Sequence, residues 1–275
     1  MKLSSVAARV ILFIVLGATL LLALGPAVWV FVSSFKTSTQ TLSGQSPFWP
    51  SPFTLEGFTS AFDLMQWAPF ANTFLYAAGG AAGAVVAALL AAYPLTRFPV
   101  RGGGMLVVAY SLALAVPVVG LATPEFFVMR TLGLLNSQGG MVLFYAAIFF
   151  PISFVILRAF LAGLPSEMEE AAVMDGAGYW RILLRIVAPL ATPALATAGV
   201  VAFVGIWNEF FYANLLISSI DVQNIQTALA AFKGQFRFNA SAVLAGTSVS
   251  MLVPITIFLL LQKYVISGLT AGATK

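Results

Sequence analysis

The chain has 275 residues, of which 60% are hydrophobic and only 8% are charged, and its mean hydropathy is +0.99. A soluble domain of this length cannot bury so much apolar surface. Cysteine and histidine are both absent, which excludes disulfides, thiol catalysis, histidine general bases and metal sites built on either residue. The net charge of +4 is interpreted as an uneven distribution of loop charges across a membrane, not as nucleic-acid binding.

Apolar stretches long enough to cross a bilayer of roughly 30 Å recur along the chain. They predict an all-α, polytopic membrane protein, 1–275, forming a single transmembrane domain. The first stretch runs without a charge from Val10 to Val32, longer than the apolar core of a usual signal peptide, so it is interpreted as an anchor. The six predicted transmembrane helices lie at about 10–33, 70–94, 104–129, 140–162, 189–213 and 241–264.

The basic residues predict the orientation of these spans. Six spans place both termini on one side, and that side then carries most of the Lys and Arg residues. The positive-inside rule makes it the cytoplasmic side, with 163–188 also cytoplasmic and with 34–69 and 214–240 outside. The cytoplasmic set is Lys2, Arg9, Arg97, Arg101, Arg158, Arg181, Arg185, Lys263 and Lys275, and the outer set is Lys36, Arg130, Lys233 and Arg237.

Spans two and three contain residues that are unusual for a simple apolar helix. The "GGAAG" run at 79–83 lies inside an apolar stretch with no lysine after it, so it is typical of close helix packing and not of a phosphate-binding loop. Pro94 predicts that span two ends or kinks there. Glu125 lies near the outer end of span three, five residues before Arg130, and is either an interfacial charge or a substrate contact.

The segment 163–188 is a polar island between long apolar runs. Ser166 and Glu169 have the spacing of a capping box, which predicts a helix beginning there. Gly176 is expected to end that helix in the left-handed conformation. A second short helix is predicted from about Tyr179 to Pro189, so the island consists of two helices joined by a Gly-Ala-Gly elbow.

Two interpretations of the island remain. An amphipathic segment lying on the membrane would have this length, but it would usually present bulky apolar residues to the lipid. Small residues instead form a smooth ridge that another protein could approach closely. These residues are Ala171, Ala172, Gly176, Ala177 and Gly178.

The spacing within the island resembles the EAA loop of ABC importer permeases. Glu170-Ala171-Ala172 is followed after three residues by Gly176, after nine more by Ile186, and then by Pro189, although Ala188 stands where this family usually has leucine. "NTFLYAAGGAAGAVVAALLAAYPLTRF" resembles the second span of the family. "GIWNEFFYANLL" and "QKYVISGLTAGATK" resemble the Trp-Asn-Glu-Phe signature and the C-terminal tail of its maltose-type carbohydrate branch.

The resemblance implies a permease subunit that translocates a carbohydrate, such as an oligosaccharide, disaccharide or related polyol, by alternating access in the cell membrane. It implies four kinds of partner: a second permease forming a heterodimer, two ABC ATPase subunits that bind ATP and Mg, an extracytoplasmic solute-binding protein, and the lipid membrane. This chain itself is expected to bind no cofactor, metal or nucleic acid and not to be an enzyme. The residues implied to contact the ATPase are Glu169, Glu170, Ala171, Ala172, Asp175, Gly176 and Ala177.

Other residues have two interpretations each. Asn208 and Glu209, late in span five, line the translocation path or its outer gate, or else they pin the span to a neighbour. Trp207 either faces the path, where it can stack on a sugar, or belongs to an aromatic belt. Asn72 belongs to the same path or caps the start of span two. The resemblance places three polar residues of the loop 214–240 against the binding protein: Asp221, Gln223 and Asn224. The alternative is that this loop is solvated.

Three other functions make different demands on the sequence of a polytopic membrane protein. A secondary transporter needs ionisable residues at mid-membrane for ion coupling, and the predicted spans have none at that depth. A membrane-embedded enzyme needs clustered catalytic residues, whereas the chain lacks His, Cys and paired acids within a span. An ABC importer permease for a substrate other than a sugar remains an alternative.

Overall fold

The computed structural model describes residues 6–43, 47–65, 67–232 and 239–271. Every regular element in these ranges is helical, which confirms the all-α class. Lys2, Lys233, Arg237 and Lys275 of the charge pattern lie outside the described residues. The chain divides into two compact units, one within 1–67 and 228–252 and the other within 68–227 and 253–275. The prediction of a single transmembrane domain stays a prediction.

The first unit contains α1 (Val6–Ser33), α2 (Ser38–Leu42), α3 (Glu56–Met65) and the start of α14 (Ala240–Ala271). Helix α1 is apolar along most of its length, and most of its side chains are exposed within the chain. An apolar helix without a protein cover is typical of a segment that lies in lipid. The short helix α3 lies within the segment 34–69 that is predicted to face outside.

The second unit contains the longest run of packed helices. Its main helices are α4 (Ala68–Arg97), α5 (Gly103–Leu112), α6 (Ala122–Thr131), α7 (Gln138–Gly163) and α11 (Thr192–Trp207). Shorter helices are α8 (Glu167–Met174), α9 (Tyr179–Ile182), α10 (Ala188–Leu190) and α12 (Phe211–Leu216), and α13 (Ile225–Ala231) ends across the boundary between the units. A π-helical turn, Leu183–Val187, joins α9 to α10.

Four described helices are long and apolar enough to cross a membrane: Ala8–Ser33, Ala68–Arg97, Gln138–Gly163 and Ala240–Lys263. Two bent pairs meet the same test, Gly103–Ala115 with Val119–Thr131 at 100° and Tyr179–Leu190 with Thr192–Trp207 at 75°. Counting each bent pair as one span also gives six spans, but the predicted fifth span, 189–213, corresponds to the second arm of its pair, because 179–189 was predicted as a separate short helix. The break near Ala191 therefore lies close to the predicted boundary at Pro189. The 100° bend after Ala115 was not predicted, although Pro117 lies beside it.

Helix α4 does not end at Pro94. It continues to Arg97, and the Pro94 carbonyl still accepts a hydrogen bond of 3.0 Å from the amide of Phe98. Proline removes one donor from the helix, but Tyr93 beside it is buried in a core cluster. We attribute the continuation to this packing.

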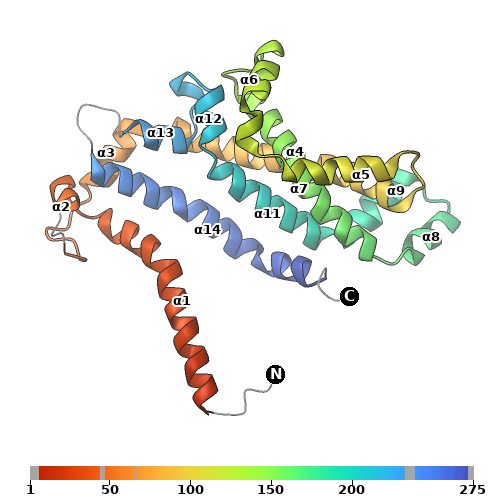
Figure 1. Ribbon diagram of the computed structural model, residues 1–275, viewed down its shortest axis with the longest axis horizontal. Helices are drawn as coiled ribbons and strands as arrows, with labels where there is room; N and C mark the ends of the chain where they lie inside the picture. The colour runs from red at the N-terminus through yellow and green to blue at the C-terminus, as the bar shows by residue number, and fades with distance from the viewer. Residues whose placement is uncertain (1–5, 44–46, 66, 233–238, 272–275) are drawn as a thin grey trace. The chain divides into compact units, whose positions relative to one another are not determined.

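Helices α4, α7 and α11 pack against one another (Figure 1). Small residues of α4 make the approach close, as the "GGAAG" run predicted. A Cβ at Gly80 would stand 2.9 Å from the Tyr145 Cβ of α7, and one at Gly83 would stand 2.9 Å from the Ala146 Cβ. Small residues let the backbones of membrane helices approach in this way.

Gly140 at the start of α7 offers a test of a different close packing contact, the one with the turn that precedes α7. An added Cβ there would overlap the carbonyl oxygen of Leu134, whereas a Cβ at the adjacent Gly139 would meet no atom within 4 Å. The Leu134 carbonyl is a backbone group and cannot rotate away as a side chain can. Overpacking should therefore lower the free energy of unfolding of Gly140→Ala by about 1–3 kcal/mol. Thermal unfolding of the purified protein in detergent measures the effect. Gly139→Ala is the matched control and should keep or raise the midpoint. Equal midpoints for the two variants would contradict the packing.

Candidate functional site

Helix α8 begins at Glu167, as the sequence predicted, but the capping box is absent. Ser166 has helical backbone angles, φ -85° and ψ -14°, and makes no side-chain cap. Its hydroxyl instead donates to Glu170 Oε1 at 2.6 Å. The carboxylate of Glu169, which the box requires, is bonded to α4. The prediction was wrong because it weighed only neighbours in the sequence.

Glu169 is held by two residues at the end of α4. Arg97 Nε lies 2.8 Å from Glu169 Oε1 in an ion pair with both side chains 13% exposed. The Tyr93 hydroxyl donates to Glu169 Oε2 at 2.9 Å. Arg97 Nη2 also donates to the carbonyl of Leu164, just after α7, at 3.0 Å. We call Tyr93, Arg97 and Glu169 the Arg97 clasp. Sequence analysis assigned no role to Tyr93 or Arg97 there, although both fall in the quoted second-span pattern.

The small residues of the island face two ways. Ala172 and Ala177 are half-buried and pack against the core cluster around α4, α7 and α9. Glu169 and Ala172 are three residues apart and therefore share the inner side of α8. The exposed positions on the opposite side form what we call the outer face of α8. They are Glu167, Met168, Glu170, Ala171, Met174 and the following Asp175.

Bulky apolar residues on and beside this face were missed by sequence analysis. Met174 is 87% exposed and Met168 is 50% exposed, and Val173, Trp180 and Leu184 are also exposed. Flexible methionines are frequent on surfaces that bind protein partners. Their presence in a segment that is otherwise polar and small was the available signal. The outer face of α8 therefore combines three acids with two methionines.

Gly176 ends α8 in the predicted conformation. Its φ is +77°, in the left-handed region. The Gly176 amide donates to the Val173 carbonyl at 3.0 Å, and the Ala177 amide donates to the Ala172 carbonyl at 2.9 Å. These two bonds form a Schellman motif. The elbow between α8 and α9 therefore has one defined geometry.

At the other end of the second unit, Asn72 of α4 is buried in a polar network. Its side-chain nitrogen donates to the carbonyls of Asp221 at 2.7 Å and Gln223 at 3.0 Å. Its side-chain oxygen accepts from Gln138 at 2.7 Å. The Asn72 side chain thus pins the loop after α12 to α4 and α7. Asp221 and Gln223 take part through backbone atoms.

Glu209 occupies the break between α11 and α12. Its carboxylate accepts from the Tyr145 hydroxyl at 2.7 Å and from the amides of Tyr212 at 2.8 Å and Ala213 at 3.0 Å. Its carbonyl accepts from the buried side chain of Asn224 at 2.7 Å. A carboxylate that binds the first amides of a helix satisfies groups that otherwise lack partners. Glu209 therefore fixes the start of α12 and the loop behind it.

The other predicted path residues differ in exposure. Trp207 is 2% exposed and stacks on Phe203 with ring centroids 5.8 Å apart. Asn208 is exposed, and its side chain donates to the Val204 carbonyl at 2.9 Å. The structure thus brings Asn72, Glu209, Asp221, Gln223 and Asn224 together and leaves Asn208 at the surface.

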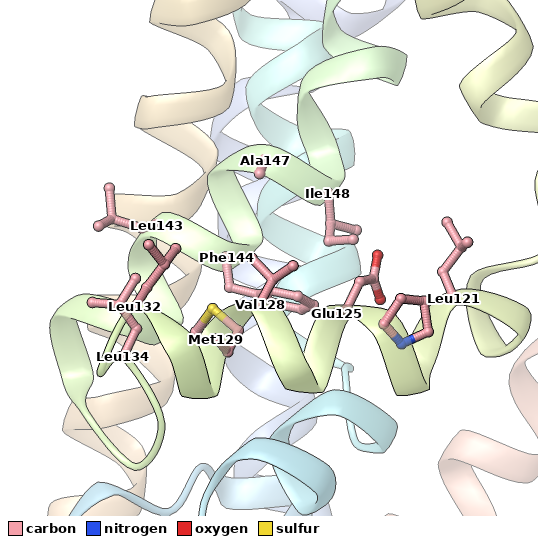
Figure 2. Close-up of a pocket in the computed structure, with 11 residues that line it drawn as sticks. Leu121, Glu125, Val128, Met129, Leu132, Leu134, Leu143, Phe144, Ala147 and Ile148 are labelled. Carbon is pink, nitrogen blue, oxygen red and sulfur yellow. The ribbon is translucent and has the colours of Figure 1, made fainter.

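Glu125 of α6 contacts the Tyr212 hydroxyl and stands at the edge of an apolar cavity of about 460 Å³ between α6 and α7 (Figure 2). Glu125 is the one charged residue among the described lining residues. Aliphatic walls offer a sugar few hydrogen-bond partners. The cavity therefore has the character of a site for apolar groups.

Gly176 allows a test of the elbow. A Cβ at Gly176 would meet no atom within 4 Å, so Gly176→Ala should lose only the backbone energy of the left-handed conformation, about 1–2 kcal/mol. The thermal midpoint in detergent should fall. Gly178→Ala is the matched control, because Gly178 has φ -77° and equally open surroundings. Gly176→Asn should lie between them, since Asn tolerates this conformation. A midpoint for Gly176→Ala equal to that of Gly178→Ala would contradict the left-handed conformation of Gly176.

Comparison with known proteins gives consistent matches. The family model "Binding-protein-dependent transport system inner membrane component" matches residues 83–270. The chain is 32% identical over 268 residues to the sulfoquinovosyl glycerol transport system permease protein SmoH of Agrobacterium fabrum, covering 96% of this chain and 93% of that protein. It is 31% identical over 257 residues to the trehalose transport system permease protein SugB of Mycobacterium tuberculosis, covering 92% and 93%.

A solved structure has the same fold. A bacterial ABC transporter involved in the import of the acidic polysaccharide alginate contains a chain that matches with a TM-score of 0.83 and 24% identity, covering 96% of this chain and 100% of that one. The family match and the relatives that align over nearly the whole chain show that this protein belongs to the binding-protein-dependent transport system inner membrane components, as a membrane permease subunit of an ABC importer.

Proposed function

We propose that this permease imports a carbohydrate, an oligosaccharide, disaccharide or related polyol, and that separate ATPase subunits drive it through 163–188. The observation that carries the proposal is the outer face of α8, which is exposed while the inner face is fixed to α4. Relatives named for sulfoquinovosyl glycerol and trehalose transport support a sugar-like substrate. Without a phosphate-binding loop in this chain, ATP and Mg are assigned to the ATPase subunits.

We infer that both termini and 163–188 are cytoplasmic. Arg97, Arg101, Arg158 and Arg181 all fall on or near this side of the spans, and basic residues favour the cytoplasm. The partners are then placed by side. Two ATPase subunits contact the 163–188 segment from the cytoplasm, and a solute-binding protein approaches the loop 214–240 from outside. A second permease completes the channel, as a heterodimer.

We propose that α8 presents Glu170, Ala171, Asp175 and Gly176 to the ATPase together with Met174. Glu169, Ala172 and Ala177 act from behind this surface by fixing its position. The acids suit basic side chains on the partner, and the methionines suit an adaptable apolar cleft. Alternating access would follow when the ATPase pair moves this segment and the spans rearrange.

In the outer half, we assign Asn208 to the translocation path because its side chain is exposed. Asn72, Trp207, Glu209 and Asn224 are assigned to the architecture of the outer gate, because each is buried or committed to bonds within the chain. The exposed side chain of Asp221, with Gln223 beside it, is assigned to the contact with the binding protein.

Complementation tests the function. Cells lacking this chain should lose uptake of radiolabelled trehalose or maltose and keep uptake of labelled amino acids. The wild-type chain should restore the loss, and Glu170→Lys should not, although it reaches the membrane in normal amount. Charge reversal on an exposed docking surface repels a basic partner.

Glu56→Lys is the matched control for this experiment. Glu56 is also an exposed acid in the first turn of a helix, so its reversal has the same unfavourable effect of about 0.3–1 kcal/mol on the helix dipole. It should leave uptake unchanged. Loss of amino-acid uptake with sugar uptake intact would contradict the carbohydrate assignment, and full uptake in Glu170→Lys would contradict the coupling surface.

A further inference from the structure

The Arg97 clasp joins three elements at one point. Arg97 is the last residue of α4, Glu169 belongs to α8, and the Leu164 carbonyl follows the end of α7. One guanidinium serves both acceptors, at 2.8 Å and 3.0 Å. A cation near the last carbonyls of a helix is favourable, so Arg97 also completes the end of α7.

Helix α9 rests on the same end of α4. The ring of Tyr179 lies 5.4 Å from that of Tyr93 and 6.0 Å from that of Phe98. Ile182 and Leu183 are buried in the core cluster that contains Tyr93 and Leu161. Both helices of the island are therefore attached to α4 by side chains, in addition to their chain connections to α7 and α11.

The chain connections are less direct than this attachment. Toward α11, the segment passes through a π-helical turn and a bend of 75° near Ala191. Toward α7, it passes through the Leu164–Ser166 connection, whose Leu164 has extended backbone, φ -80° and ψ 134°. Along the chain, a movement of α8 is transmitted to α7 or α11 only through these bends. Through the ion pair of Glu169 with Arg97 it is transmitted to α4 directly.

We propose that Tyr93 and Arg97 are positioning residues for energy coupling, and that the Arg97 clasp makes α4 the span that moves with the 163–188 segment. The inference rests on the proposed function, because it assigns a route to the movement that the ATPase causes. Helix α4 carries Asn72 of the outer network at its other end. One rigid helix thus links the cytoplasmic segment to the outer polar network.

The chemistry of the clasp requires arginine. A planar guanidinium can donate to a carboxylate and a carbonyl in fixed directions, while a lysine ammonium is a single point of charge. Loss of Arg97 leaves Glu169 with the Tyr93 hydroxyl as its one side-chain partner at this site. A carboxylate that is mostly shielded and has lost its cation is unfavourable. Such a carboxylate should turn toward water, and α8 should separate from α4.

The experiment uses the assembled transporter in lipid nanodiscs with its ATPase subunits. Ala71, exposed at the outer end of α4, is replaced by cysteine in this cysteine-free chain, and the rate of its reaction with a charged thiol reagent is measured. MgATP with vanadate should change the rate about tenfold if α4 is coupled to the ATPase. Arg97→Gln and Glu169→Gln should reduce that change below about twofold, while the ATPase stays bound and still hydrolyses ATP.

Two further variants separate positioning from general damage. Arg101→Gln removes an exposed arginine four residues from Arg97 and should keep the full response. The double variant Arg97→Glu with Glu169→Arg exchanges the two charges. It rebuilds the ion pair but not the hydrogen bond to the Leu164 carbonyl. It should restore about half of the response, because the effects of residues in contact are not additive. Rescue by exchange is not expected if the single variants only misfold.

The outcomes are distinct. A full response in Arg97→Gln and Glu169→Gln with the ATPase bound overturns the clasp and leaves the proposed function intact. If Arg97→Gln and Glu169→Gln lose the response to MgATP and the exchange variant loses it equally, the ion pair does not couple α8 to α4, and the proposal is overturned. A parent chain that neither retains the ATPase nor responds to MgATP overturns the proposed function and the clasp together.

Discussion

The close approach of α4 and α7 is the constraint on which the second unit depends. In a bilayer, apolar side chains gain little by leaving lipid for another helix, so association relies on tight packing and on buried polar bonds. The glycines and alanines of α4 supply the packing, at Gly80 against Tyr145 and at Gly83 against Ala146. Tyr145 is completely buried by this contact. Its hydroxyl is then directed to Glu209, which fixes the start of α12.

Polar residues occupy the two ends of this packed pair. At one end, Asn72 and Glu209 bind backbone groups of the segment after α11. At the other end, Arg97 binds Glu169 and the carbonyl after α7. Buried polar groups are costly unless each finds a partner, and the partners of Asn72 and Arg97 come from segments distant in sequence. The polar contacts therefore determine which loops are fixed to which span.

Local features of the fold could be predicted from the sequence. The apolar runs located the spans, and the start of α8 and the positive φ of Gly176 followed from helix-capping rules. Each depends on residues within a few positions of one another. The capping box failed because its Glu169 is bonded to Arg97, 72 positions away. A single sequence gives no indication of which long-range partner will compete with a local one.

The candidate site was predictable to a similar extent. The EAA resemblance located the loop, but the division of α8 into a fixed inner side and an exposed outer face depends on how α8 rests on α4. The 100° bend before α6 also depends on packing, and periodicity alone predicts that bent pair as one span. The sequence left Trp207 between the translocation path and an aromatic belt, and Asn224 between the binding protein and a solvated loop, whereas both side chains are buried within the chain.

The central claim is that the outer face of α8 contacts the ATPase. A photo-crosslinking amino acid in place of Met174, whose side chain on that face is 87% exposed, tests it in the assembled transporter. Irradiation should give a covalent product between this chain and an ATPase subunit, and the same amino acid in place of the exposed Ile220 in the loop after α12 should give none. A product at Met174 with lipid or with the second permease alone, while the ATPase remains bound, would contradict the claim.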